Sequence, residues 1–386
     1  MLTSLLQEEL EVLKARDLYR KLRSLRMTCA TRAEFEGREL LLFCGNDYLG
    51  LSHHPRVIEA AKKACEEYGV GAGAARLISG TSELHTRLEE SLASFKGKEK
   101  ALIFTAGYLA NLGILSTLAG EGDLVVMDKL CHASLIDGAR LSGAHLRVFP
   151  HKNYEKCEEI FQKSPGFRKR FLVSDTVFSM DGDLADLQAL VRIKERYEAF
   201  LLVDDAHGTG VLGLEGKGAA EDLKIEEKID CVAGTLSKAL GCVGGFAAAS
   251  PETIDYLINF SRPFIFATAL PPAICQAALT ALEVLRTEPE IRHRLWQNIQ
   301  KMHEGLLASG FASGPIGSPI FPVMIGPEKE ALRLSDALFE LGLLVPAVRY
   351  PTVPKGKARL RVTVSASHSE QDIRKLIRAL ETCQKP

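Results

Sequence analysis

Seven short apolar runs recur between about residues 100 and 250. Each run is apolar at consecutive positions, which is typical of strands buried on both faces. Stretches with helical spacing separate most of them, as in ADLQALVRIKERYE at 185–198. The pattern predicts an α/β fold with a mostly parallel seven-stranded sheet between helices. The predicted strands are ALIF at 101, DLVVMD at 123, LRVFP at 146, RFLVSD at 170, AFLLVDDA at 199, DCVAGTL at 230 and GGFAAAS at 244.

The pattern changes after a helical segment at about 272–310. PIFPVMIG at 319, a helical stretch, LGLLVPAVRYP at 341, ARLRVTVSA at 358 and a last helix follow in order. This alternation predicts a smaller C-terminal α/β domain over 286–386. The opening MLTSLLQEELEVLKARD has amphipathic spacing, so we expect an N-terminal helix and arm over 1–45 and a large domain over 46–285.

Composition excludes several function classes. Lys plus Arg (48) nearly balance Asp plus Glu (49) in the 386 residues, so no electrostatic footprint for nucleic acid or an anionic membrane is expected. No apolar run reaches the roughly 18 residues that a membrane span needs. The nine cysteines are odd in number and form no C-x-x-C pair, which favours a reducing cytoplasm. Work on a small molecule is the expected function.

Ligands of such sheets bind outside the carboxyl ends of the strands. Polar residues that end the predicted strands are therefore the candidates: Thr105 to Tyr108, Asp128 to His132, Asp175 to Ser179, Asp204 to His207 and Thr235 to Lys238. GVGAGAARLISG at 69–80 resembles a dinucleotide fingerprint, but PRVIEAAKKACEEY before it is helical instead of a strand. We interpret it as a glycine-rich loop.

Two strand-end residues suggest a specific chemistry. Asp204 ends a buried strand, where a carboxylate needs a positive partner, and a protonated pyridine nitrogen would serve. Lys238 lies among small residues in GTLSKALG, where partial desolvation would make its amine a nucleophile able to form a Schiff base with an aldehyde. TAGYLANLGIL begins a helix after a strand and suits a phosphate. An alternative from another class is a metal-dependent hydrolase that uses Asp204, Asp205 and His207 of DDAH.

Together these requirements describe pyridoxal 5'-phosphate (PLP), and the sequence resembles the α-oxoamine synthases, a family of fold-type I PLP enzymes. The resemblance runs along nearly the whole chain, through NDYLGL (46–51), GAGAARLISGTSELHTRLE (71–89), HASL (132–135), FSMDGD (178–183), VDDAHGTG (203–210), TLSKALG (235–241) and PTVPKGKARLRVT (351–363). It implies a PLP-dependent acyltransferase that joins an amino acid to an acyl-CoA with loss of carbon dioxide.

The resemblance also implies the cofactor contacts. Lys238 would bind the cofactor covalently and move the substrate proton, Asp204 would pair with the pyridine nitrogen, and His207 would bond the phenolic oxygen. The other implied contacts are His132 stacked on the ring, Gly107, Tyr108 and Thr235 at the phosphate, Ser179 beside the cofactor, and Thr268 at the phosphate of the partner subunit in a homodimer.

The resemblance places the substrates as well. Arg361 would bind the amino-acid carboxylate with Asn46 nearby, Arg20 would meet the distal end of the acyl chain with Arg23 as a competitor, and Arg349 and Thr352 would border the substrate. DDAHGTG fits best the family member that uses L-alanine and pimeloyl-CoA in biotin biosynthesis. A glycine C-acetyltransferase, or another member with a different acyl chain, is the nearest alternative. A non-catalytic family subunit would have lost the lysine, and Lys238 is present.

Overall fold

A seven-stranded sheet organises the larger part of the chain, as the apolar runs predict. The computed structural model describes residues 2–311 and 316–384. The strand order is β4-β10-β9-β8-β7-β5-β6, and β10 alone runs antiparallel to its neighbours. The strands are β4 (Lys100–Phe104), β5 (Leu124–Asp128), β6 (His145–Phe149), β7 (Arg170–Asp175), β8 (Phe200–Asp204), β9 (Cys231–Thr235) and β10 (Gly245–Ala249).

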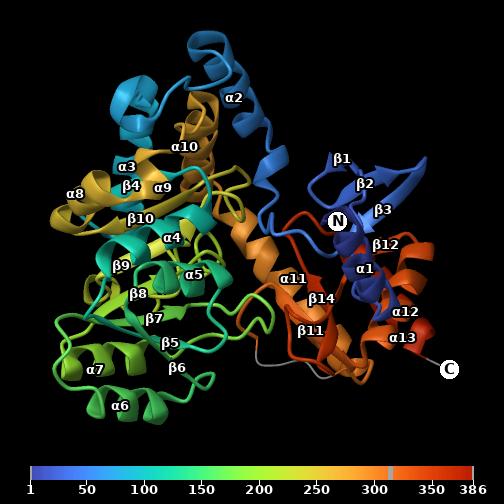
Figure 1. Cartoon of the computed structure of the whole chain (residues 1–386). Helices are drawn as coiled ribbons and strands as arrows, with labels where there is room; N and C mark the ends of the chain where they lie inside the picture. The colour runs from blue at the N-terminus through green and yellow to red at the C-terminus, as the bar shows by residue number, and fades with distance from the viewer. Residues whose placement is uncertain (1, 312–315, 385–386) are drawn as a thin grey trace. The chain divides into compact units, whose positions relative to one another are not determined.

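Each face of this sheet has its own apolar core, because successive side chains of a strand point to opposite faces. Val125 and Met127 of β5 pack with α4, α5, α8 and α9, whereas Leu124 and Val126 pack with α6 and α7. Figure 1 shows this layered arrangement. The helices are α4 (Gly107–Leu118), α5 (Ala133–Leu141), α6 (Tyr154–Gln162), α7 (Leu187–Tyr197), α8 (Pro251–Phe260) and α9 (Arg262–Ile265).

A helical layer also covers the β4 end of the sheet, where α10 packs on α2 and α3, and α3 packs on β4. α2 confirms that the segment before the glycine-rich loop is helical. These helices and the short segments beside them are η1 (Leu51–His53), α2 (Pro55–Tyr68), η2 (Arg76–Gly80), α3 (Glu83–Lys96), η3 (Glu226–Lys228) and α10 (Pro272–Thr287).

The chain divides into two compact units, each described here by itself. The sheet unit comprises Asp47–Ser179 and Asp183–His293, and the second unit comprises Met1–Asn46, Met180–Gly182 and Arg294–Pro386. The three-part division predicted from the sequence stays a prediction. The smaller C-terminal α/β arrangement is confirmed, since the second unit holds the elements expected after the sheet.

The second unit contains two small sheets. One has the order β11-β14-β13 and is antiparallel, and the other has the order β1-β2-β3-β12 with β12 parallel to β3. Its elements are α1 (Leu2–Ala15), β1 (Arg26–Cys29), β2 (Arg32–Phe35), β3 (Arg38–Leu42), β11 (Ile320–Gly326), α12 (Glu328–Glu340), β12 (Leu343–Leu344), β13 (Ala347–Val348), β14 (Ala358–Thr363) and α13 (Glu370–Gln384), with α11 (Pro289–Ala308) beginning in the sheet unit. The sequence predicted the N-terminal helix but not strands β1 to β3.

Candidate active site

Asp204 ends β8 with its side chain 7 % exposed. Its two carboxylate oxygens accept hydrogen bonds from Asn111 Nδ2 at 2.6 Å and from the Ala206 backbone N–H at 2.9 Å. Asn111 lies on α4 one turn after Gly107 and also donates to Ser134 Oγ at 2.9 Å. These bonds fix the carboxylate at the end of the strand, where a cationic ring nitrogen could approach it.

The turn after β8 separates the three polar side chains of DDAH. Asp204 bonds Asn111, Asp205 forms an ion pair with Lys96, and His207 Nδ1 lies 2.7 Å from the Tyr48 hydroxyl. Within residues 2–311 and 316–384 no group of three His, Cys, Asp or Glu side chains could hold a metal ion. The geometry therefore does not favour the metal-dependent hydrolase.

His132 caps the N-terminus of α5 just beyond β5. Its Nδ1 lies 2.7 Å from Ser134 Oγ and accepts from the Ser134 backbone N–H at 3.3 Å. Burial lowers the pKa of His132, and the nearby charge of Lys238 lowers it further, while Asp204 opposes them. A neutral imidazole at neutral pH suits stacking on a planar ring. The mutual influence of these charges also shows that His132, Asp204 and Lys238 lie near one another.

Asp175 is a further acidic group at this edge. It ends β7 directly opposite Asp204 of β8, and its Oδ1 accepts from the His132 backbone N–H at 3.1 Å. Burial raises the pKa of Asp175 well above its usual range, and the charge of Asp204 raises it further. Asp175 is therefore driven toward the neutral form.

The start of α4 forms a candidate phosphate cradle. Ala106 provides no side-chain cap for the helix, so the first backbone N–H groups have no capping side chain. A Cβ at Gly107 would lie 3.1 Å from the Thr235 Cβ and 3.2 Å from its hydroxyl oxygen. Thr235 Oγ1 in turn lies 2.6 Å from Ser237 Oγ. The helix N–H groups and the Thr235 hydroxyl thus lie together at Gly107, an arrangement that suits a phosphate.

Lys238 is half-buried in a loop that follows β9. The Leu236 N–H bonds the Gly244 carbonyl at 3.0 Å, and the Gly241 N–H bonds the Lys238 carbonyl at 2.9 Å, which closes the loop. Gly241 has φ +65°, and a Cβ there would lie 2.2 Å from the Ser52 nitrogen. Glycine at 241 is therefore required to hold the lysine loop against the segment after Gly50.

Ser179 follows a short bridge at the edge of the same sheet unit. Val177 pairs with Leu184, and the Phe178 N–H donates to the Asp183 carbonyl at 3.0 Å. The side chain of the same Asp183 bonds His151 at 3.0 Å, and His151 also bonds Asp128 at 2.9 Å. The base of the loop that carries Ser179 is thereby fixed.

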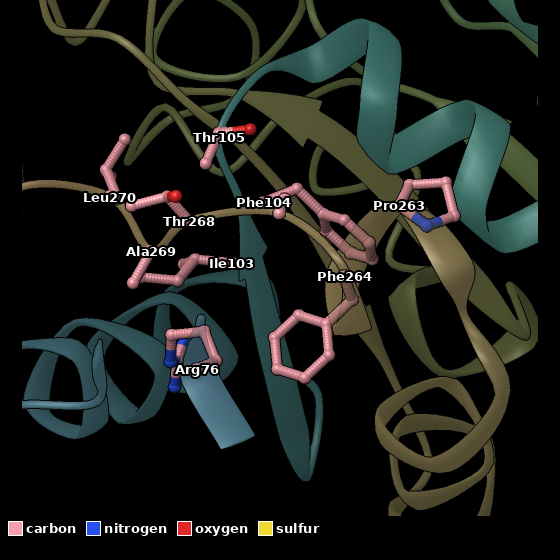
Figure 2. Close-up of a pocket in the computed structure, with 10 residues that line it drawn as sticks. Arg76, Ile103, Phe104, Thr105, Pro263, Phe264, Thr268, Ala269 and Leu270 are labelled. Carbon is pink, nitrogen blue, oxygen red and sulfur yellow. The ribbon is translucent and has the colours of Figure 1, made fainter. Parts of the chain in front are cut away.

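Thr268 is exposed on the segment after α9 and forms a bridge with Ala75 of the glycine-rich loop. Figure 2 shows it among the residues that line a small pocket, with Thr105, Phe264 and Leu270. The cavity volume of about 10 Å³ admits at most a water molecule. This pocket is too small for a substrate, and Thr268 is an exposed residue of its lining.

The predicted substrate residues all lie in the second unit, where the structure groups them into two sets. Arg361 of β14 donates from both terminal nitrogens to Asn46 Oδ1 at 3.3 Å. Its side chain is buried, and Asn46 closes the segment after β3. The guanidinium therefore bonds a neutral amide through both terminal nitrogens.

The second set lies around the loop after β13. Arg20 Nη2 lies 3.4 Å from Thr352 Oγ1, and both residues are exposed. Burial lowers the pKa of Arg349, and the neighbouring charge of Arg20 lowers it further. The competitor Arg23 lies over the ring of Phe339 instead, 4.9 Å from its centroid. The structure thus brings Arg20, Arg349 and Thr352 together.

The sequence did not predict the contacts of three further residues at the site. Asn111 and Tyr48 each bond a predicted residue, 93 and 159 positions away in the chain. Asp175 was within a candidate strand end, but its pairing with Asp204 depends on the strand register. The only signal for Asn111 is its position four residues after Gly107, on the same helix face.

Comparisons with known proteins cover nearly the whole chain. The family model described as aminotransferase class I and II matches residues 38–380. A curated protein of Citrifermentans bemidjiense, named 8-amino-7-oxononanoate synthase, is 46% identical over 368 residues, which are 95% of this chain and 94% of that protein.

Two solved structures share the fold at comparable coverage. The serine palmitoyltransferase of Sphingomonas wittichii aligns with a TM-score of 0.92 at 34% identity, over 98% of this chain and 96% of that one. The 8-amino-7-oxononanoate synthase of Francisella tularensis aligns with a TM-score of 0.77 at 31% identity, over 89% of this chain and 97% of that one. Both the predicted fold and the resemblance are confirmed.

Proposed function

The chain belongs to the aminotransferase class I and II family, and we propose that it has 8-amino-7-oxononanoate synthase activity within that family. It is a PLP-dependent acyltransferase that condenses L-alanine with a pimeloyl thioester and releases carbon dioxide. The observation that carries the proposal is that His132, Asp204 and Lys238 lie near one another. They follow three different strands, and Lys238 is half-buried.

The residues at this edge fit PLP. The buried Asp204 carboxylate suits a protonated pyridine nitrogen, and the cradle at Gly107 suits a phosphate. We assign the phosphate contacts to Gly107, Tyr108 and Thr235, and a cofactor contact to Ser179. Bound PLP supplies an electron sink for the carbanion formed at the substrate Cα.

The residues of the chain carry the proton and charge transfers. Lys238 would hold PLP covalently through its Nζ, and the same amine, when free, would be the base that takes the Cα proton of alanine. The Cα would attack the thioester carbonyl with loss of coenzyme A, and the carboxylate would leave as carbon dioxide. The proton held by Lys238 and one proton from solvent would go to the coenzyme A thiolate and back to the Cα. Asp204 would keep the ring nitrogen charged, and His207, whose Nδ1 lies 2.7 Å from the Tyr48 hydroxyl, would bond the phenolic oxygen.

The substrate contacts follow from the two sets of arginines. We assign the alanine carboxylate to Arg361 with Asn46, because a guanidinium fork binds a carboxylate in a bidentate manner. We assign the distal carboxylate of the pimeloyl chain to Arg20 and Arg349 with Thr352, because two adjacent guanidinium groups favour an anion between them. A short acyl chain without a distal carboxylate would not use the second set.

A homodimer is part of the proposal. Exposed apolar side chains flank the bridge between Ala75 and Thr268: Leu77 and Ile78 are 52 % and 80 % exposed, and Phe266 is 70 % exposed. Apolar patches of this kind mark surfaces that bind protein. A second copy that covers them would bring Thr268 to the phosphate of its partner.

We also retain the cytoplasm as the proposed location. The nine cysteines are all free thiols, and the four at Cys131, Cys157, Cys231 and Cys275 are buried. Free thiols in this number fit a reducing compartment. Along the described ranges, no helix is both long and apolar enough to cross a membrane.

The experiment is a product assay with a panel of donors and amino acids. Purified chain with PLP is given alanine, glycine or serine together with pimeloyl-CoA, acetyl-CoA or palmitoyl-CoA, and the ketone product and released thiol are measured. The proposal predicts the highest kcat/KM for alanine with pimeloyl-CoA. A preference for glycine with acetyl-CoA would assign the chain to glycine C-acetyltransferase chemistry instead.

A further inference from the structure

A buried ion pair involves Asp205, the residue that follows Asp204 in the chain. Lys96, the last residue of α3, places its Nζ 2.7 Å from Asp205 Oδ2, and the two side chains are 2 % and 4 % exposed. Burial of two charges costs free energy that their attraction only partly returns. The mechanism uses neither residue, so the pair needs another explanation.

Asp205 anchors the turn that carries His207. Its Oδ1 accepts from the Thr176 hydroxyl at 2.6 Å, and its Oδ2 accepts from the Thr209 hydroxyl at 3.2 Å. Its backbone carbonyl accepts from the N–H groups of Gly208 at 3.2 Å and Thr209 at 2.9 Å. The position of His207 therefore depends on the Asp205 carboxylate.

A second loop closes over the same pair. Lys96 Nζ also donates to the Lys217 carbonyl at 2.5 Å. A Cβ at Gly218 would lie 1.8 Å from Asp205 Oδ2 and 2.9 Å from Lys96 Nζ, and Gly218 has φ +117°. Only glycine fits there, so the loop is shaped around the ion pair and not merely beside it.

Lys96 also distinguishes two adjacent carboxylates. Asp204 and Asp205 follow one another in the chain, yet Asp204 bonds the neutral amide of Asn111 whereas Asp205 has a lysine as its partner. The charge of Lys96 neutralises Asp205. Among the described residues, no cationic side chain is bonded to Asp204. That is the electrostatic arrangement that a pyridinium ring requires of its partner.

We infer that Lys96 is a positioning residue for the cofactor: by neutralising Asp205 and anchoring the turn 205–209, it sets Asp204 and His207 for PLP. The inference rests on the proposed function. It predicts that removal of the Lys96 charge weakens cofactor binding, beyond any loss of stability.

The test compares apo-protein variants by titration with PLP, followed by absorbance, and by thermal melting. Lys96→Met leaves Asp205 buried without a cation, Asp205→Asn leaves Lys96 without an anion, and the double variant removes both charges. Lys98→Met is the matched control, because Lys98 lies two residues on and donates to the carbonyls of Glu226 and Ile229, away from Asp205. Lys96→Gln, which keeps an amide donor, replaces Lys96→Met if that variant does not fold.

Each single variant is expected to raise the Kd for PLP roughly tenfold or more, the scale on which loss of an outer hydrogen-bond partner changes a site. The double variant is expected to bind PLP more tightly than either single variant, because its two losses are coupled. Lys98→Met is expected to keep the wild-type Kd even where it lowers the melting temperature.

Two results would overturn the inference. If the Lys96 and Asp205 variants lower the melting temperature but bind PLP with the wild-type Kd, the pair is structural only. If the double variant binds PLP no more tightly than the better-binding single variant, charge neutralisation is not the role of the pair. Failure of the wild-type chain to bind PLP is a different outcome, which would reject the proposed function and this inference together.

Discussion

The candidate cofactor residues and the candidate acyl-end residues are held in opposite ways. Asp204 and His207 are buried, 7 % and 6 % exposed, and each is fixed by short hydrogen bonds from neighbouring elements. Arg20 and Thr352 are exposed and share one long contact of 3.4 Å. The first region is organised before any ligand arrives, whereas the second has little to hold it until a ligand does.

This contrast separates binding of the cofactor from choice of the acyl chain. A preorganised site places its charges without further cost at the moment of reaction. Exposed side chains lose rotamer freedom when they bind, so they contribute less per contact. Substitutions in the first region should therefore abolish turnover, and those in the second should mainly change KM.

The largest effect is expected for Lys238→Ala. Without the amine no residue can take its place as the covalent anchor and base, so turnover should fall by at least about 10³-fold. The measurement is the rate of ketone formation, with Lys62→Ala, an exposed lysine of α2, as the control. Substantial activity in Lys238→Ala would remove this lysine from the role of base.

Asp204→Asn should come next. The amide keeps the shape of the side chain but cannot hold a positive ring nitrogen, so kcat should fall roughly 10²–10³-fold, as on loss of one preorganised electrostatic contact. Asp255→Asn is the matched control, because its carboxylate is 56 % exposed and pairs with Lys100 at the surface. Equal kcat in the two variants would contradict the role given to Asp204.

Arg361→Lys should raise the KM for alanine more than it lowers kcat. Lysine keeps the charge but not the bidentate fork, and loss of a hydrogen bond to a charged group costs about 1.5–3 kcal/mol, or roughly tenfold or more. Steady-state kinetics with alanine as the varied substrate measures this, with Arg374→Lys, an exposed residue of α13, as the control. An unchanged KM would place the alanine carboxylate elsewhere.

Arg20→Gln sharpens the comparison at the exposed region. The KM for pimeloyl-CoA should rise a few-fold, the modest value expected of an exposed ion pair. Arg23→Gln should leave that KM unchanged, because Arg23 packs on Phe339. The same pair of variants assayed with acetyl-CoA should show no difference, and a difference there would contradict binding of a distal carboxylate by Arg20.

The smallest effect is expected for His151, which bonds Asp128 and Asp183 near the buried cofactor residues. Burial opposes the charge of His151, but hydrogen bonds to Asp128 and Asp183 outweigh it and raise the pKa of His151 to about 9. The folded pKa is above the unfolded value of about 6.5, so this stabilisation is fully present below pH 6.5 and is lost as pH rises through 9.

Thermal melting of the wild-type chain and His151→Gln across this range measures the contribution. The difference in melting temperature between the two proteins should shrink by roughly 2–4 °C as pH rises toward 9 and above. This is the shift that about 1 kcal/mol produces in a domain of 150–250 residues. A difference that does not change with pH would show that His151 acts through packing on Phe178 instead.

The sequence predicted the sheet well because six of its seven strands are almost wholly buried and apolar, and all seven runs form strands, including the mostly exposed edge strand β6. It did not predict β1 to β3, since RMTC and RAEF contain no apolar run and only Ala33 is buried in these two strands. The site residues at the strand ends could be predicted because the strands themselves could be predicted. The residues that hold them in place could not: Lys96 bonds Asp205 across 109 positions, which no local sequence pattern encodes.

The most direct test of the central claim is a titration of the PLP-loaded chain with L-alanine, glycine and L-serine, followed by visible absorbance. The account predicts a cofactor band that borohydride reduction fixes covalently to Lys238, that L-alanine perturbs at lower concentration than glycine or serine, and that changes again when pimeloyl-CoA is added. A band perturbed only by glycine or serine would contradict the alanine substrate. A chain that forms no such band would contradict the PLP chemistry itself.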